Sequence, residues 1–442
     1  MVSYSSDADT SRQRKRPATP SRDRQGAVSS AVADTLLPLC ETFSRRVGSR
    51  LPASRRTFTR TVPLACCLAL GLAVLLPDGV GAAPPAVQSA TGTHAELRRL
   101  VGPGAKIITT RHFVVVYDTP IETVHRLTAR VEATYRSIEK FCTFNKIDFV
   151  PPREPLAILL FDEPESFHRY AASIGVNAEG LSGFYYTGNN CSAFFNVLNH
   201  PNLSELRREI GHLERQVARF SGRQLSKTER NEKRAAAKRL HLIRNRRNRM
   251  VEKLNRSVVQ HEVVHHLLFE AGVHPRGIPI PGWLVEGLAM LFESPPSSKG
   301  AGIGVVNQMR LADFRAACGE ELDPQNKRPR KMEPETLRHA YDAGRFIPLR
   351  RFIPLSQLPN DANVGYYYAQ AWGLTFYLQR THRKELAGYI NTLAHRRPGE
   401  QPTPEEELEQ FEVIFGPVDE RFERRWAALI FNLRFVPEFP GE

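Results

Sequence analysis

This chain lacks a long apolar run and cysteines at the spacing of metal-binding motifs. Only 6 of its 442 residues are cysteines, and no two stand at Cys-x-x-Cys spacing, which argues against cysteine-based zinc and redox motifs. An apolar run at 62–76 is about fifteen residues long, whereas a membrane-spanning helix needs about twenty. The run fits the core of a signal peptide. We therefore expect an exported protein, either periplasmic, bound to the cell envelope or secreted.

The N-terminal hundred residues are predicted to precede the folded body. Residues 1–60 are rich in Ser, Arg, Thr and Pro and should be disordered. Residues 61–83 are interpreted as a signal peptide or a membrane anchor, which leaves membrane association through 62–76 open, and residues 84–104 as a linker with a short polar helix. Beyond them, an oxidising compartment would permit a disulfide between Cys142 and Cys191, which the sequence does not decide.

Lys and Arg outnumber Asp and Glu by 61 to 47, but the excess of positive charge is not evenly spread. The formal net charge of the chain is +14. Residues 1–60 hold 12 Lys or Arg against 5 Asp or Glu (+7), and residues 203–256 hold 17 against 6 (+11), so the remainder carries −4. The basicity belongs to two appendages of a mildly acidic body, and it is no argument for nucleic-acid binding by the whole protein.

A His-Glu-x-x-His segment at 261–265, in the middle of the chain, is the candidate metal-binding motif. Residues 255–272 have the apolar spacing of an amphipathic helix that ends at Gly272. Positions i and i+4 share one helical face, so His261 and His265 can direct two imidazoles at one metal ion. Glu262 stands beside them, where it can hold a metal-bound water. This helical setting favours a metal site over a chance pair of core histidines.

A second segment supplies the third ligand. Glu286, separated from His265 by twenty residues, stands in the helix-like segment Trp-Leu-Val-Glu-Gly-Leu-Ala at 283–289. Three protein ligands and one open position are typical of a catalytic zinc site rather than a structural one. The sequence therefore predicts Zn2+ bound by His261, His265 and Glu286.

The extended motif of the metzincin peptidases is absent. That motif has a glycine three residues after the second histidine and a third histidine three residues further on, whereas this chain has Leu268 and Ala271 there. The metzincin subclass is thereby excluded. His266 points away from the ligand face and His274 lies past Gly272, so we interpret both as solvated or satisfied histidines.

At these residues the chain resembles the gluzincins, zinc peptidases whose third ligand is a glutamate on a following helix. The 283–289 segment is similar to the Trp-Leu-Asn-Glu-Gly-Phe-Ala signature of aminopeptidase-N-type enzymes, from which it departs at Val285 and Leu288. Glu293 also matches an acidic position of these enzymes. It is either a hydrogen-bond partner of a metal ligand or an exposed residue at the end of the helix. A wider resemblance, from about 111 to about 379, is to an uncharacterised bacterial family, a domain of unknown function among the peptidases of the same superfamily.

The resemblance implies a hydrolase with a zincin-like catalytic domain. It would cleave peptide bonds with a metal-activated water and Glu262 as the general base. A tyrosine or histidine of the helical lobe usually stabilises the oxyanion. The resemblance favours Tyr368 over its neighbours Tyr366 and Tyr367, although core packing explains all three as well, and Arg310 is a weaker candidate for a substrate contact.

The same resemblance bears on how a peptide or protein substrate would bind. In gluzincin-like folds the strand before the zinc helix is an edge strand, and an extended substrate pairs with its free backbone groups. We expect residues 193–197 to be that strand.

Hydrophobic periodicity predicts an α+β fold with a small mixed sheet. In residues 105–202, the N-terminal part of the catalytic domain, strands are expected at 107–117, 156–161, 184–186 and 191–197, and helices at 121–141 and 164–174. The last two strands should form a hairpin around residues 187–190. The zinc helix opens the segment 255–442, which continues as a largely helical C-terminal lobe. Helices are expected there at 305–318, 334–343, 366–381, 384–395 and 405–433, and the last of them should be interrupted near Gly416 and Pro417.

Residues 203–254 predict an inserted basic helical hairpin that turns near Ser221 and Gly222. Aromatic residues are nearly absent from it, Phe220 excepted, so nucleic acid is not the expected partner. The hairpin is either a solvated insertion or an arm for an anionic partner. Two alternatives to a peptidase thus stay open: another metal-dependent hydrolase, or a catalytically silent peptidase-like envelope protein that binds anionic partners through 203–254.

Overall fold

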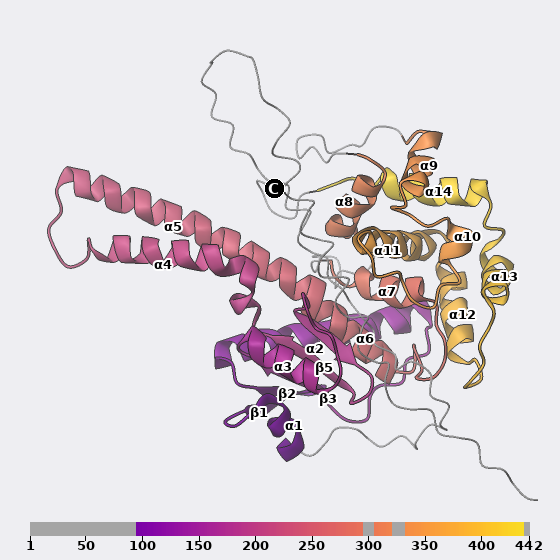
Figure 1. Cartoon of the computed structure of the whole chain (residues 1–442), viewed down its shortest axis with the longest axis horizontal. Coiled ribbons are helices and arrows are strands. Elements are labelled where there is room, and N and C mark those ends of the chain that lie inside the picture. Colours follow the sequence, from indigo (N-terminus) through magenta and orange to yellow (C-terminus); the bar gives the residue numbers. More distant parts are fainter. Residues whose placement is uncertain (1–93, 295–304, 321–331, 437–442) are drawn as a thin grey trace, which may run out of the picture. The chain divides into compact units, whose positions relative to one another are not determined.

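The computed structural model describes residues 94–294, 305–320 and 332–436 (Figure 1). The expected disordered region, signal peptide or anchor, and the linker up to residue 93 lie outside the described residues. Within these three ranges, no helix is both long enough and apolar enough to cross a membrane. The described part is α+β, as predicted, with one small mixed sheet and a largely helical C-terminal lobe.

Five strands form the sheet in the order β1-β2-β3-β5-β4. Their bounds are Lys106–Thr109 for β1, Phe113–Tyr117 for β2, Leu156–Phe161 for β3, Gly183–Tyr186 for β4 and Cys191–Phe195 for β5. The three central strands are parallel, and the two edge strands β1 and β4 are antiparallel to their neighbours.

The single strand expected at 107–117 is wrong, because the chain turns back between β1 and β2. Thr110 N donates a hydrogen bond to Phe113 O at 2.8 Å. The Glu132 carboxylate accepts from Thr110 Oγ1 at 2.7 Å and from His112 N at 2.9 Å. This side chain, 20 residues further on, pins the turn and so creates a hairpin that local periodicity does not reveal.

Helices cover both faces of the sheet, which explains the unbroken apolar runs of its central strands. In β2, Phe113, Val115 and Tyr117 face the larger core with α2 (Ile121–Asn145), whereas Val114 and Val116 face a second core with α1 (His94–Val101) and α3 (Pro164–Ser173). Cys142 belongs to the first core and Cys191 to the second, and both are free thiols, so the disulfide considered between them is not formed.

The edge-strand expectation is corrected by the strand order. Residues 191–195 form β5, which pairs with β3 on one side and with β4 on the other. The free edge on this side of the sheet belongs to β4. The hairpin that joins β4 and β5 was predicted, but which of its two strands lies outside depends on contacts with β3, far away in the sequence.

The predicted basic hairpin is present and leads into the metal-motif helix. Helix α4 (Ser204–Ala218) packs along α5 (Lys227–Leu254), which starts with a capping box formed by Ser226 and Glu229 (Figure 1). A π-helical turn, η4 (Asn255–Gln260), then joins α5 directly to α6 (His261–Glu270).

The C-terminal lobe surrounds the buried helix α11 (Val364–Thr381), as Figure 1 shows. Its neighbours include α7 (Gly282–Leu291), α8 (Gln308–Ala317), α12 (Arg383–Ala394) and α14 (Glu420–Phe431). The remaining helices are α9 (Pro334–Asp342), α10 (Leu349–Phe352), which was not predicted, and α13 (Pro404–Phe415). The break expected near Gly416 separates α13 from α14.

Candidate metal centre

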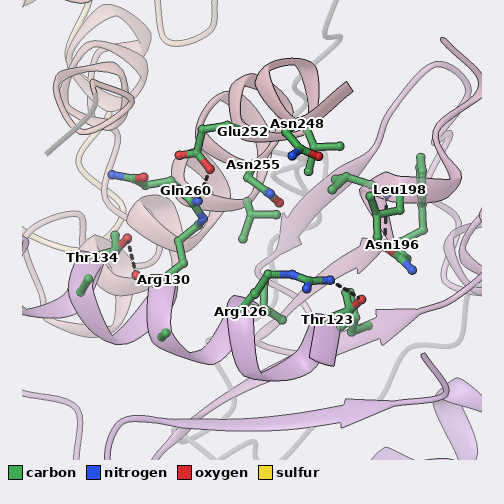
Figure 2. A pocket seen from close by; sticks show the side chains of 18 of the residues that line it. Thr123, Arg126, Arg130, Thr134, Asn196, Leu198, Asn248, Glu252, Asn255 and Gln260 are labelled. Carbon is green, nitrogen blue, oxygen red and sulfur yellow. Dashed lines mark hydrogen bonds and ion pairs between the residues drawn. The ribbon is translucent and has the colours of Figure 1, made fainter. Parts of the chain in front are cut away.

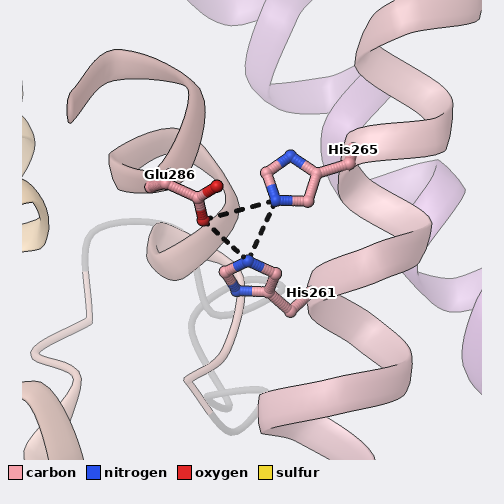
Figure 3. A group of neighbouring side chains, drawn as sticks. All are labelled: His261, His265 and Glu286. Carbon is pink, nitrogen blue, oxygen red and sulfur yellow. Dashed lines mark hydrogen bonds and ion pairs between the residues drawn. The ribbon is translucent and has the colours of Figure 1, made fainter. Parts of the chain in front are cut away.

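Helix α6 places two imidazoles side by side. His261 is its first residue, and His265 follows one turn later on the same face. Figure 3 shows both rings directed at the same point, with their Nε2 atoms 3.0 Å apart. The π-helical turn η4 ends at the residue before His261, and such turns recur at functional sites because they change the register of the helix that follows.

Helix α7 brings Glu286 to the same point. Its carboxylate oxygen Oε2 lies 3.1 Å from His261 Nε2 and 3.5 Å from His265 Nε2 (Figure 3). The next residue, Gly287, allows α7 to cross α11 closely: a Cβ there would lie 1.9 Å from Thr375 Oγ1 and 2.9 Å from the backbone oxygen of Ala371. The Glu-Gly pair therefore combines a ligand with the only residue type that fits this crossing.

The three predicted ligands form one buried group that could hold a metal ion. Atoms bound to zinc at about 2.0–2.1 Å in a tetrahedron lie about 3.3–3.4 Å apart. The three contacts between ligand atoms, at 3.0, 3.1 and 3.5 Å, scatter around that value. Two imidazoles and one carboxylate also form a donor set that divalent transition metals accept.

Charge in the group favours a cation. Hydrogen-bonded carboxylates of Glu286 and Glu293, acting against burial, raise the pKa of His261 to about 10. Also against burial, His265 and His261 hold the pKa of Glu286 at about 2. Burial lowers the pKa of His265, which keeps that ring in the neutral form that binds metals. Without a metal ion, protonated His261 is the positive partner of Glu286, and Arg310 is that of Glu293. A divalent ion bound to the neutral His261 ring would take over the first of these roles.

Glu293 orients His261 from behind. Its Oε1 lies 2.8 Å from His261 Nδ1, and its two oxygens accept from Arg310 Nη2 at 2.9 Å and Nε at 3.1 Å. Asn307 Nδ2 donates a further bond of 2.8 Å. Glu293 is buried, so of its two interpretations the structure selects a partner of a candidate ligand. Arg310, considered for a substrate contact, is buried in this network instead.

Asn307 is the member of this network that sequence reasoning missed. It is the N-cap of α8, where its Oδ1 accepts from Arg310 N at 3.2 Å. An Asn that precedes a helix is a recognisable cap signal. Its second role, as a donor to Glu293, depends on the approach of α8 to α7 and has no sequence signal.

Glu262 lies in the same buried region with one oxygen engaged and one without a partner. Oε2 accepts from Tyr185 N, on the edge strand β4, at 3.0 Å. Oε1 is buried and has no hydrogen-bond partner among the described residues. Burial raises the pKa of Glu262 to about 8. This carboxylate is therefore held by the sheet, and its second oxygen is able to accept a proton.

Of the three tyrosines considered, Tyr368 is the one that contacts Arg310, the residue that holds Glu293. Burial and then the charge of Glu286 raise the pKa of Tyr368 well above the usual value. Arg310 lies against its ring, 5.4 Å from the centroid. Tyr367 points elsewhere, since its hydroxyl donates to Gly344 O and to Asp361 Oδ2, both at 3.3 Å. Tyr366 is partly buried against the core.

The expectation of a solvated or satisfied histidine is met at one ring nitrogen of His266 but is wrong for His274, and neither ring is solvated. His266 is satisfied at Nδ1, which lies 2.9 Å from Ser192 Oγ, and its ring stacks on Tyr185. His274 is buried with no partner at either ring nitrogen in the described part of the chain. The turn after α6 explains its burial: His274 N bonds back to Leu268 O at 3.0 Å, which directs the ring inward. Burial lowers the pKa of both rings to about 3.

Comparisons with known proteins give one match, to a family model that covers part of the chain. No curated protein and no solved structure matches the chain. The matching part holds His261, Glu262, His265, Glu286, Glu293 and Tyr368, but not Tyr185. The domain of unknown function, expected from about 111 to about 379, is confirmed over residues 255–400, while the resemblance to gluzincins stays a prediction. Residues 255–400, the part that carries the candidate metal centre, match the family model described as "Protein of unknown function (DUF1570)".

Proposed function

We propose that this protein is a zinc-dependent peptidase of the gluzincin type. The observation that carries the proposal is the buried group of His261, His265 and Glu286, with the Glu262 carboxylate beside it. A structural zinc site usually has four protein ligands, whereas this group has three, which is the number typical of catalytic sites.

His261, His265 and Glu286 would hold the zinc ion. When bound, zinc supplies Lewis-acid chemistry: it polarises a carbonyl oxygen and lowers the pKa of water. Glu293 keeps the His261 ring in place by accepting from Nδ1, and Arg310 fixes Glu293 with two hydrogen bonds. Such partners of metal ligands orient the ring and raise its basicity.

Glu262 acts as the general base. The bond from Tyr185 N holds its Oε2, so Oε1 is the oxygen that accepts a proton from the attacking water. The same carboxyl group then donates that proton to the nitrogen of the leaving amine. Burial raises its pKa to about 8 without a metal ion, and the charge of a bound cation would lower that pKa and favour the ionised, basic form.

Tyr368 and the free edge of β4 have two further roles, in stabilising the oxyanion and in binding the substrate backbone. The Tyr368 hydroxyl donates a hydrogen bond to the developing oxyanion, and its raised pKa keeps it protonated for that role. The free edge of β4, which takes the place of the strand expected at 193–197, offers backbone groups that an extended peptide can pair with. Tyr185 N already lies on this edge and bonds to Glu262, so a paired peptide would lie next to the general base.

The proposal is tested with three variants of the full chain. Glu262→Gln should retain zinc, measured by mass spectrometry of the dialysed protein, yet lose peptide-library cleavage by about a hundredfold or more. Glu286→Gln should lose both zinc and cleavage. Glu139→Gln, which removes the same charge from the exposed surface of α2, is the control and should change neither.

Two results would refute parts of this proposal. Full zinc occupancy after replacing both His261 and His265 by Ala would disprove the metal site. Bound zinc with no cleavage of any library peptide would disprove the peptidase and favour the catalytically silent alternative.

A further inference from the structure

A groove lies between α2, α5 and the carboxyl ends of β3 and β5, with a volume of about 1140 Å³ (Figure 2). None of the candidate metal ligands lines it, nor do Glu262 and Tyr368. Its lining is therefore a different set of residues from the site proposed for peptide cleavage, although Gln260 and Ser294, the chain neighbours of His261 and Glu293, border it. Ligands of α/β proteins commonly bind at the carboxyl ends of parallel strands, which is where this groove opens.

Its lining is strongly basic. Five of the lining residues carry a positive charge: Arg126, Arg130, Arg136, Lys140 and Arg247. A single lining residue, Glu252, is acidic, which leaves a formal charge of +4. The body of the chain is mildly acidic, so this concentration of positive charge in a concave surface is a local property. Concave surfaces of one charge sign attract ligands of the opposite sign.

The arginines of the two walls differ in their hydrogen-bond partners. Arg130 of α2 is neutralised by Glu252 of α5, with Nη2 and Oε2 2.7 Å apart (Figure 2). Arg126 donates to the neutral Thr123 Oγ1 at 3.2 Å, and Arg247 donates to the neutral Asn248 Oδ1 at 3.0 and 3.3 Å. Arg126 on α2 and Arg247 on α5 therefore line the groove without a carboxylate partner among the described residues.

The uncharged lining narrows the class of ligand. Asn255 and Asn248 add amide donors on the α5 side (Figure 2). Phe195 is the one aromatic residue in the lining of this groove, so the stacking that bound nucleobases require is not provided. Donors that come from two walls match a tetrahedral oxyanion, which presents acceptor oxygens in several directions. Arginine forks bind such oxyanions through paired hydrogen bonds.

We propose that this groove binds a phosphate-bearing anion. Arg126 and Arg247 supply the charged contacts from opposite walls, and Asn255 supplies an uncharged donor. Glu252 opposes binding, because it contributes negative charge and occupies Arg130. The phosphate belongs either to a soluble compound or to the headgroup of a lipid, and the two sources make the same contacts here.

The first test measures pyrophosphate binding to the full chain by isothermal titration calorimetry. The double variant Arg126→Ala, Arg247→Ala should bind about tenfold more weakly or worse, since each change removes a charge-assisted hydrogen bond. The matched control is Arg234→Ala, Lys238→Ala: both are exposed on α5, outside the groove, and the net charge falls by the same two units. Equal weakening in both double variants would overturn the proposal.

A second variant should strengthen pyrophosphate binding instead of weakening it. Glu252→Gln removes the opposing charge and frees Arg130, so pyrophosphate should bind severalfold more tightly, which loss of folding cannot imitate. Unchanged or weaker binding would contradict the role of the groove.

Sedimentation with vesicles identifies the source of the phosphate. Phosphatidylglycerol vesicles, but not phosphatidylcholine vesicles, should carry the protein down if the ligand is a lipid headgroup, and Arg126→Ala, Arg247→Ala should abolish this. Pyrophosphate binding without vesicle binding assigns a soluble phosphate compound. Binding of neither probe, or tighter binding of polyglutamate than of pyrophosphate, refutes a phosphate site.

Discussion

Replacing Gly287 by Ala tests how the crossing of α7 and α11 positions Glu286. A Cβ at residue 287 would lie 1.9 Å from Thr375 Oγ1, 2.8 Å from Thr375 Cβ and 2.9 Å from Ala371 O. Rotation of the Thr375 side chain can relieve the first contact. It cannot relieve the other two, since Cβ and the backbone oxygen move only with α11 itself.

The magnitude follows from these distances. To bring the contact with Ala371 O from 2.9 Å to an ordinary 3.4 Å, the two helices must separate by about 0.5 Å. Overpacking of this kind costs about 1–3 kcal/mol, and a gap of this width loses about a quarter of the dispersion energy along the crossing. Glu286 precedes Gly287 on the same helix, so its distances to the two imidazoles grow and zinc affinity falls as well.

The assay is urea denaturation together with the zinc content of dialysed protein. Gly388→Ala is the control, because Gly388 is an exposed position of α12 with nothing within 4 Å of the added Cβ. That variant should gain about 0.5–1 kcal/mol of stability, since Ala is the better helix former. Adding Thr375→Ala to Gly287→Ala should recover part of the loss, and the double-mutant cycle measures the coupling. If Gly287→Ala is as harmless as Gly388→Ala, the packing argument for the Glu-Gly pair is wrong.

Two further predictions follow from the buried groups. Glu293→Gln keeps a partner for His261 Nδ1 but loses the charge, so zinc should be lost to a competing chelator at about 10–100-fold lower chelator concentration; an unchanged competition curve would contradict the orienting role of Glu293. Burial raises the pKa of Cys142, Cys191 and Cys318 to about 12, so these thiols should resist iodoacetamide in the native protein at pH 8 and react fully in guanidinium chloride, as peptide mapping can show. Rapid native labelling would contradict their burial.

Much of the secondary structure followed from local patterns. The strand at 156–161 has the predicted bounds, and the hairpin at 203–254 has its two helices. Both elements have a clear local pattern. The strand is an apolar run between two prolines, and the hairpin has apolar residues at helical spacing. The failures have non-local causes. The turn between β1 and β2 depends on Glu132, and the position of β4 outside β5 depends on pairing with β3.

The candidate site divides in the same way. The sequence by itself determined that His261 and His265 share a face, because the spacing of four residues acts through the helix geometry alone. The segment 283–289 also predicted Glu286 as the third ligand. The distance from Glu286 to the imidazoles, however, depends on how closely α7 can approach α11. Only the tertiary structure decided the role of Glu293 and Arg310, the burial of His274 and the bond from Tyr185 to Glu262. Each of these contacts joins elements that are far apart in the chain, and packing rather than periodicity determines which elements meet.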